Sequence, residues 1–277
     1  MKRILTIQDI SCFGKCSLTI ALPVISAMGV ETVILPTAVL STHTMFKNFT
    51  VKDLTDQLLP ITRHWQSEGI TFDAIYTGYL GSPEEIGLTK QIFEMFRTEN
   101  TMIFIDPVMA DNGKLYAAFD EEYVRLNADL CAAADVIVPN ITEACFMTGT
   151  PYRESYDEPY ILGLLSRLAK LGAKTVVLTG VSLSPGKTGI YGLDTVTGKT
   201  FVYQNDRVSA SYHGTGDLFS SVAVAAAVQG MPLLEAFRIA ADYTAFTIEE
   251  TLKNPDKPGY GVDFEATIPA LLRMLGK

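Results

Sequence analysis

The segment from His213 to Ser221 combines two glycines, a carboxylate and the start of an alanine-rich helix. The first backbone N–H groups of a helix have no partner within the helix, and together with the helix dipole they favour anions. Glycine would let a phosphate approach these groups closely, since it carries no Cβ atom. An acid in this place fits a base that takes a proton from a substrate hydroxyl while the amides stabilise a phosphoryl group. The catalytic candidates are therefore Gly214, Thr215, Gly216 and Asp217.

Taken alone, Asp217 is better explained as a favourable negative charge in the first turn of a helix. The chemical interpretation therefore depends on other acids. Asp106 directly follows an apolar strand at 102–105, and Glu143 lies in the first turn of the helix that follows a strand at 135–138. The carboxyl ends of parallel strands meet at one edge of a sheet, so we expect both acids there. Together they could bind Mg²⁺ directly or through water, as phosphoryl transfer requires.

Each of these two acids also has a simpler interpretation. Asp106 precedes a proline and could be a turn residue. Glu143 stands three residues after Asn140, in a variant of the helix capping box, and could serve only the cap. For each residue alone the two interpretations are about equally supported, and it is the joint position of the acids that favours a metal site.

Other nucleotide-binding motifs fit less well. The glycine-rich segment 180–188 has five residues between its glycines where a Walker phosphate loop has four, and a strand follows it where that motif requires a helix. Gly214 and Gly216 lack the third glycine of the dinucleotide fingerprint, which disfavours a Rossmann oxidoreductase. Four scattered cysteines and three histidines form neither a disulfide framework nor a zinc pattern.

Alternating apolar segments predict the elements that position these residues. The alternation predicts an α/β fold, a three-layer α/β/α sandwich with a mostly parallel central sheet. The segment 37–48, rich in hydroxyl groups, is expected to be a long loop or short strands that could cover a site, and Pro60 should kink the second helix. Strands are expected at 3–8, 32–35, 73–77, 102–105, 135–138 and 174–179, with a hairpin at 189–193 and 200–204. Helices are expected at 17–28, 51–66, 84–97, 121–128, 160–171, 218–229, 232–250 and 263–275.

Composition excludes several classes of protein. Of 277 residues, 48% are hydrophobic and 19% are charged, as in a globular chain, and no linker divides the sequence, so we expect one domain over residues 1–277. The net charge of −9, with acidic and basic residues interspersed, argues against a nucleic-acid partner. No apolar run is long enough for a signal peptide or a membrane span, so we expect a cytoplasmic protein.

Five segments, taken in chain order, resemble the pyridoxal kinase branch of the ribokinase-like superfamily. Each would be a weak signal alone, but together they extend over most of the chain. The segments are Ser41-Thr42-His43-Thr44, Gly78-Tyr79-Leu80-Gly81-Ser82, Asp106-Pro107-Val108-Met109, Pro139-Asn140-x-x-Glu143 and Gly214-Thr215-Gly216-Asp217.

This resemblance implies ATP-dependent phosphorylation of the 5′-hydroxymethyl group of pyridoxal, pyridoxine or pyridoxamine, with Mg²⁺, often a monovalent cation such as K⁺, and commonly a homodimer. It implies that Asp217 is the base and that Asp106 and Glu143 bind the metal and the ATP phosphates. The resemblance also suggests that ATP is bordered by Val138, Asn140 and Thr179. The residues expected around the pyridine ring are Asp9, Thr44 and Tyr79, with His43 as a further candidate.

The chain departs from the family at two contact positions. Asp9 stands where pyridoxal kinases often have Ser, and Thr179 stands where some have Lys. Related hydroxymethylpyrimidine kinases of thiamin synthesis share the fold and the chemistry. Some dual-specificity members carry a cysteine pair at the site, and here Ala110 and His213 replace it, which favours the vitamin B6 substrates. Hydroxymethylpyrimidine kinase activity and a non-catalytic pyridoxal-binding protein remain alternatives.

Overall fold

The structure is a computed structural model that describes residues 1–210, 212–257 and 259–277. Within these residues, nine strands form one sheet in the order β11-β10-β9-β8-β5-β4-β1-β2-β3. Neighbours from β2 through β9 pair in parallel, whereas β3, β10 and β11 run antiparallel to their neighbours. The mostly parallel sheet is therefore confirmed. Its strands are β1 (Arg3–Ser11), β2 (Glu31–Leu40), β3 (Val51–Asp53), β4 (Ala74–Thr77), β5 (Met102–Ile105), β8 (Val136–Ile137), β9 (Thr175–Val181), β10 (Lys187–Asp194) and β11 (Thr200–Asp206).

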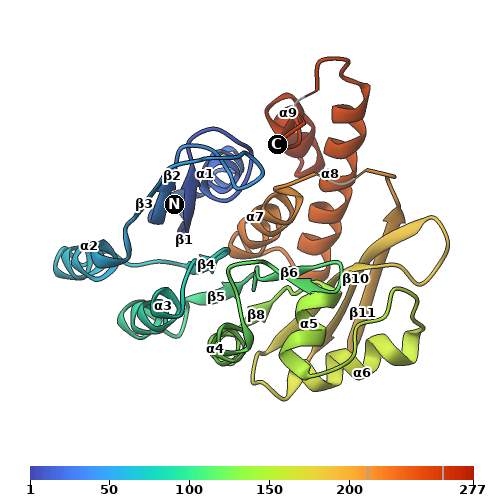
Figure 1. The fold of residues 1–277 in the computed structure, drawn as a ribbon, viewed down its shortest axis with the longest axis horizontal. Helices are drawn as coiled ribbons and strands as arrows, with labels where there is room; N and C mark the ends of the chain where they lie inside the picture. Colours follow the sequence, from blue (N-terminus) through green and yellow to red (C-terminus); the bar gives the residue numbers. More distant parts are fainter. Residues whose placement is uncertain (211, 258) are drawn as a thin grey trace.

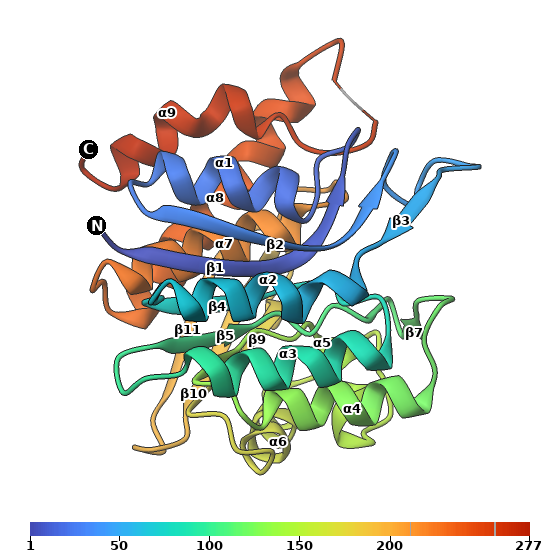
Figure 2. The same cartoon turned by 90° about the vertical axis from the view of Figure 1, so that its left-hand side faces the viewer.

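Helices cover both faces of this sheet (Figures 1 and 2), so the expected three-layer sandwich is also confirmed. One face carries α2 (Thr55–Ser67), α3 (Pro83–Phe96), α4 (Glu121–Cys131), α5 (Ile141–Thr148) and α6 (Glu158–Ala169). The other face carries α1 (Leu18–Ala27), α7 (Thr215–Val228), α8 (Leu233–Lys253) and α9 (Phe264–Met274). No helix within the described ranges is long and apolar enough to cross a membrane.

The central strand β1 explains why both faces are covered. Its side chains alternate, so Leu5 and Ile7 pack against the first helix layer while Ile4 packs against the second. All three are fully buried. A strand that is apolar on both sides is typical of a parallel sheet between two helix layers.

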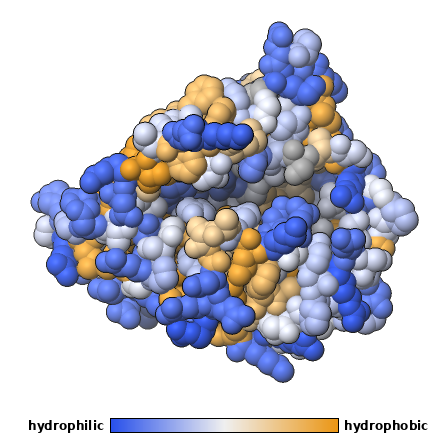
Figure 3. Space-filling model, viewed as in Figure 1, coloured by the Kyte–Doolittle hydropathy of each residue, from blue (hydrophilic) through white to orange (hydrophobic). Residues whose placement is uncertain are grey.

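Parallel strands end at one edge of the sheet, and the residues after them form the face seen in Figure 1. The loop 12–17 follows β1, and residues 106–109 follow β5, before a small hairpin of β6 (Ala110–Asp111) and β7 (Lys114–Leu115). In the space-filling view this face is hollowed near its middle, where hydrophilic residues gather (Figure 3). The candidate site lies at this edge.

Of the two alternatives for 37–48, a strand holds in the first part and a loop in the rest. β2 continues past Pro36 to Leu40, because residues 38–40 pair with β3 and residues 39 and 40 also pair with the extended end of β1. Only residues 41–50 lie between the two strands. The second helix starts at Thr55 and not at Val51, since residues 51–53 form β3, and it continues through Pro60.

Candidate active site

The turn before α7 places the helix N-terminus against the loop that follows β1. Gly214 has a left-handed backbone, with φ 81°, and a Cβ atom there would lie 2.0 Å from the carbonyl oxygen of Lys15. Both facts require glycine. α7 begins at Thr215, three residues earlier than the sequence predicts, so Thr215, Gly216 and Asp217 form its first turn. Their backbone N–H groups therefore have no helical carbonyl partner and face the open edge, as an anion site needs.

Asp217 is held at this helix start by a single backbone donor. Its Oδ2 accepts a hydrogen bond of 2.8 Å from the N–H of Ser17, in the loop after β1. Burial raises the pKa of Asp217 to about 7, the Ser17 bond lowers it, and the Asp106 and Asp9 carboxylates add to the rise. The side chain keeps partial exposure at the edge of the sheet. A carboxylate that is accessible and titrates near neutrality is suited to act as a general base.

Asp106 and Glu143 lie together at the same edge, one after β5 and the other in α5. The Oδ2 of Asp106 accepts a hydrogen bond of 2.8 Å from Ser220 Oγ, one turn along α7 from Asp217. Burial raises the pKa of Asp106, and burial together with the Asp106 charge raises the pKa of Glu143 well above its ordinary range. Asp106 is thus close enough to raise the pKa of Glu143, and a divalent cation would supply a counter-charge to these two buried carboxylates.

Glu143 also completes the helix cap that the sequence predicts. Its Oε2 accepts from the N–H of Asn140 at 2.8 Å, its Oε1 accepts from the N–H of Met109 at 3.1 Å, and Asn140 Oδ1 accepts from the N–H of Glu143 at 2.9 Å. No group of three or more His, Cys, Asp or Glu side chains among the described residues could hold a metal by itself. Mg²⁺ commonly binds through one or two carboxylates with phosphate and water, so this donor set fits the ion together with a nucleotide.

The residues expected at the nucleotide divide into two groups. Asn140 and Thr179 are paired across the ends of β8 and β9, where the N–H of Thr179 donates to the carbonyl of Pro139 at 3.0 Å and Asn140 Nδ2 donates to the carbonyl of Ala110 at 2.8 Å. Both side chains are partly exposed. Val138, in contrast, is buried in the core beneath α7. A contact of Val138 with the nucleotide would therefore have to come from its backbone.

Asp9 and Tyr79 lie close enough for the Asp9 carboxylate to raise the pKa of the Tyr79 hydroxyl. Asp9 is buried and accepts hydrogen bonds from Ser17 Oγ at 2.7 Å and Ser11 Oγ at 3.3 Å, and burial raises its pKa. Burial, with Asp9 as the next cause, raises the pKa of Tyr79 to about 12, and the Tyr79 ring packs 5.5 Å from that of Phe119. A flat ring beside a carboxylate suits a heteroaromatic substrate with a polar substituent.

His43 and Thr44 are neighbours in the loop after β2, but one is buried and the other is exposed. His43 is buried, its Nδ1 accepts from the N–H of Met45 at 3.2 Å, and its Nε2 lies 3.0 Å from the carbonyl of Tyr260. This pattern requires the proton on Nε2, and burial lowers the pKa of the ring. Both ring nitrogens of His43 are therefore engaged within the protein. Thr44 is exposed.

Aromatic rings border the site on the side of His43. The His43 ring lies 5.3 Å from the rings of both Phe46 and His213, and Phe13 lies 4.8 Å from Tyr260. These rings come from four separate segments of the chain. They form an aromatic cluster in which His43 interacts with the charge of Asp9, and His213, which had no predicted role, belongs to it.

The sequence does not predict which residues donate hydrogen bonds to Asp9, Asp106 and Asp217. Ser17 binds Asp217 and Asp9, and Ser220 binds Asp106. Ser17 stands just before a helix and Ser220 lies within one, and neither position in the sequence indicates a carboxylate partner. Burial together with the Asp217 and Asp9 charges raises the pKa of Cys16 to about 12, so it is a neutral thiol.

Comparison with known proteins identifies the relatives of this chain. Residues 20–260 match the phosphomethylpyrimidine kinase family. A protein of Bacteroides thetaiotaomicron assigned as a phosphomethylpyrimidine kinase is 35% identical, with a TM-score of 0.94 over 98% of this chain and 93% of that chain. A second crystal form of it, with pyridoxal, gives a TM-score of 0.92 over 98% of this chain and 95% of that chain.

Two relatives carry the name that the sequence motifs suggest. Pyridoxal kinase from Lactobacillus plantarum is 31% identical, with a TM-score of 0.90 over 99% of this chain and 98% of that chain. Pyridoxal kinase of Dictyostelium discoideum is 27% identical over 238 residues, which are 79% of this chain and 76% of that protein. The predicted resemblance is confirmed. The protein is a phosphotransferase, and it belongs to the phosphomethylpyrimidine kinase family, within the ribokinase-like superfamily.

Proposed function

We propose that this protein transfers the γ-phosphoryl group of ATP to the 5′-hydroxymethyl group of pyridoxal, pyridoxine or pyridoxamine. The observation that carries the proposal is the position of Asp217, in the first turn of α7 on a backbone donor and with its pKa raised to about 7. The Bacteroides relative crystallised with pyridoxal and the Lactobacillus pyridoxal kinase support the choice of substrate.

The residues of the site suggest a division of labour. Asp217 would take the proton of the substrate hydroxyl as that oxygen attacks the γ-phosphate, and the amides of residues 214–217 would stabilise the charge on the transferred group. Mg²⁺, when bound with ATP, would neutralise phosphate oxygens. Asp106 and Glu143 would hold that ion, Asn140 and Thr179 would border the nucleotide, and the substrate ring would lie by Asp9 and Tyr79.

The pKa of Asp217 gives an expected pH dependence. Only the carboxylate can accept a proton, so kcat/KM should rise with pH through about 7 and level off above it. A pH profile from about pH 5.5 to 9, with stability checked at each value, measures this limb. A profile that stays flat down to about pH 5.5, as expected for a group with the ordinary Asp pKa of 3.8, would show that Asp217 is not the titrating base.

A second candidate acceptor is hydroxymethylpyrimidine or its phosphate. The family match favours it, as does the hydroxymethylpyrimidine/phosphomethylpyrimidine kinase of Aquifex aeolicus, which is 25% identical over 71% of this chain. Such a ring also carries a hydroxymethyl group, so the same base and anion site would serve it.

The identity of the acceptor is tested by mass spectrometry of the products, with each acceptor assayed at the same concentrations of ATP and Mg²⁺. We expect phosphorylated products from pyridoxal, pyridoxine and pyridoxamine, a lower kcat/KM for hydroxymethylpyrimidine, and loss of all turnover in EDTA that added Mg²⁺ restores. Assays with and without K⁺ test the monovalent cation, and light scattering tests the expected homodimer. A higher kcat/KM for the pyrimidine would establish the second candidate, and binding of pyridoxal without any product would establish a non-catalytic binder.

A further inference from the structure

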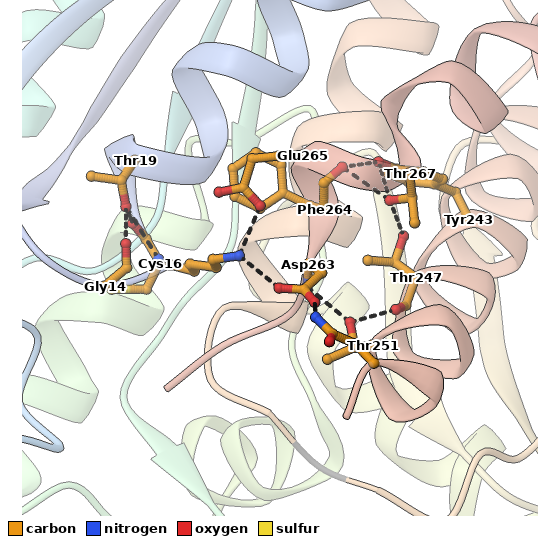
Figure 4. Close-up of polar contacts among 12 residues, drawn as sticks. Gly14, Cys16, Thr19, Tyr243, Thr247, Thr251, Asp263, Phe264, Glu265 and Thr267 are labelled. Carbon is orange, nitrogen blue, oxygen red and sulfur yellow. Dashed lines mark hydrogen bonds and ion pairs between the residues drawn. The ribbon is translucent and has the colours of Figure 1, made fainter. Parts of the chain in front are cut away.

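One side chain, Lys15, ties the loop after β1 to the C-terminal part of the chain. Its Nζ lies 3.0 Å from Asp263 Oδ1 and 2.8 Å from Glu265 Oε2, and dashed lines mark both contacts in Figure 4. The side chains of Lys15 and Asp263 are only 15% and 18% exposed. An ion pair shielded in this way is screened less by salt than one on an open surface, so it can fix the two segments relative to each other.

The surroundings of Lys15 are shaped to hold it in place. Gly261 lies against its stem, where a Cβ atom would come 2.5 Å from Lys15 Cβ, and its Nζ lies 5.7 Å from the centre of the Phe264 ring. Burial alone would lower the pKa of Lys15, but Glu265 and Asp263 outweigh it and the pKa is raised. Lys15 therefore stays charged.

Asp263 is itself held in a polar network. Its Oδ2 accepts from Asn254 Nδ2 at 2.7 Å, and its N–H donates to Thr251 Oγ1 at 2.8 Å (Figure 4). Through Thr247 and Thr267 the same network continues between α8 and α9. The partner of Lys15 is thus part of the packed helix layer and not a free surface acid.

The other end of the same loop supports the acids of the site. Ser17 has φ 48° and ψ −131°, a backbone conformation that residues with a Cβ atom rarely adopt. In this conformation its N–H donates to Asp217 and its Oγ donates to Asp9. A strained residue keeps its conformation only where its surroundings enforce it.

We propose that Lys15 is a positioning residue for phosphoryl transfer, whose two ion pairs hold the loop so that the Ser17 N–H stays on Asp217. Lys15 touches none of the reacting atoms and acts through the base. The proposal rests on the role of Asp217 given above. It adds that the C-terminal helix layer takes part in catalysis through Asp263 and Glu265.

The test compares Lys15→Met with Lys15→Arg. We expect Lys15→Met to lower kcat on the order of tenfold to hundredfold, because a small displacement of the base is costly, while KM for ATP changes less than about twofold. Lys15→Arg keeps a charge that can contact both carboxylates, so it should recover most of the loss. Lys2→Met is the matched control, since it removes an ion pair with Asp73 at the opposite edge of the sheet and should leave kcat unchanged.

A second pair of variants separates positioning from a loss of folding. Glu265→Gln removes only the partner that is 57% exposed, so the fold should be kept and kcat should fall in the same direction by a smaller factor. In an Asp217→Asn background, Lys15→Met should cause no further loss, because its effect passes through the base. Folding of every variant is checked by circular dichroism and thermal melting.

Each outcome then decides between the two proposals. If Lys15→Met and Glu265→Gln both keep wild-type kcat while Asp217→Asn is inactive, the positioning role is wrong and the proposed function stands. A full additional loss from Lys15→Met in the Asp217→Asn background would also overturn it, since the two residues would act independently. If Asp217→Asn itself retains wild-type turnover, the proposed role of Asp217 as base is wrong, and the positioning role of Lys15, which rests on it, is wrong as well.

Discussion

Replacing Asp217 with Asn is expected to lower kcat with pyridoxal by a factor on the order of 10² to 10⁴, the usual contribution of a general base. The amide has nearly the same shape and can still accept the Ser17 N–H, so pyridoxal and ATP should bind with affinities close to those of the wild type. Single-turnover product formation measures the loss, and calorimetric titration measures the binding.

The same variant should not lose stability at alkaline pH. Burial raises the folded-state pKa of Asp217 above its ordinary 3.8, so the stability linked to this group is fully present below about pH 4 and is lost as pH rises through about 7. Asn removes the cost of the buried charge, and we expect its melting temperature at about pH 8 to equal or exceed that of the wild type.

A matched control for this variant is Asp129→Asn, on α4, where the carboxylate is 53% exposed. Its turnover should equal that of the wild type. Near wild-type turnover in Asp217→Asn would exclude this carboxylate as the base, and a large loss in the control would show that the assay reports folding and not chemistry.

Replacing Gly214 with Ala is expected to destabilise the protein by about 2 to 5 kcal/mol and to lower turnover on the order of a hundredfold. The new Cβ would overlap the Lys15 carbonyl oxygen at 2.0 Å and would lie 2.7 Å from Ile20 Cδ1, so the start of α7 must move. That movement displaces both the anion-binding amides and Asp217. Urea unfolding and steady-state kinetics measure the two effects.

Gly230→Ala provides the comparison for Gly214→Ala. Gly230 follows the same helix, has φ 92°, and would carry a Cβ atom with nothing within 4 Å. It should cost only the backbone term of about 1 to 2 kcal/mol and leave kcat unchanged. Equal losses in the two variants would mean that the contact with Lys15 has no importance for the site.

Much of the fold follows from local sequence pattern. Apolar runs such as 102–105, followed by Asp-Pro, are buried strands, and the glycine turn before an alanine-rich segment is a helix start, because each pattern reflects interactions within a few residues. The capping box of Asn140 and Glu143 is confirmed for the same reason. The three-residue spacing is enough to place both cap residues within hydrogen-bond distance of each other.

The features that could not be predicted depend on contacts between residues far apart in the sequence. β2 runs through Pro36 because β3 and the end of β1 provide partners, and neither pairing is visible in the local pattern. The side chain of Val138, a residue expected at the nucleotide, is buried in a core cluster that includes residues of α7, and the local pattern does not show this packing. The Ser17 donor of Asp217 lies 200 positions away in sequence, so only the folded chain brings them together.

The contact between Lys15 and Asp263, 248 positions apart, also has a consequence for the order in which the protein becomes competent during synthesis. Chains fold from the N-terminus as they are made, and contacts of such long sequence separation form last. A nascent chain would already carry the turn before α7 and Asp217, the proposed base, while the loop that contains Ser17 still lacked its contact with Asp263. On this view the chain would reach its full activity only when the C-terminal helix has docked and Lys15 has met Asp263 and Glu265.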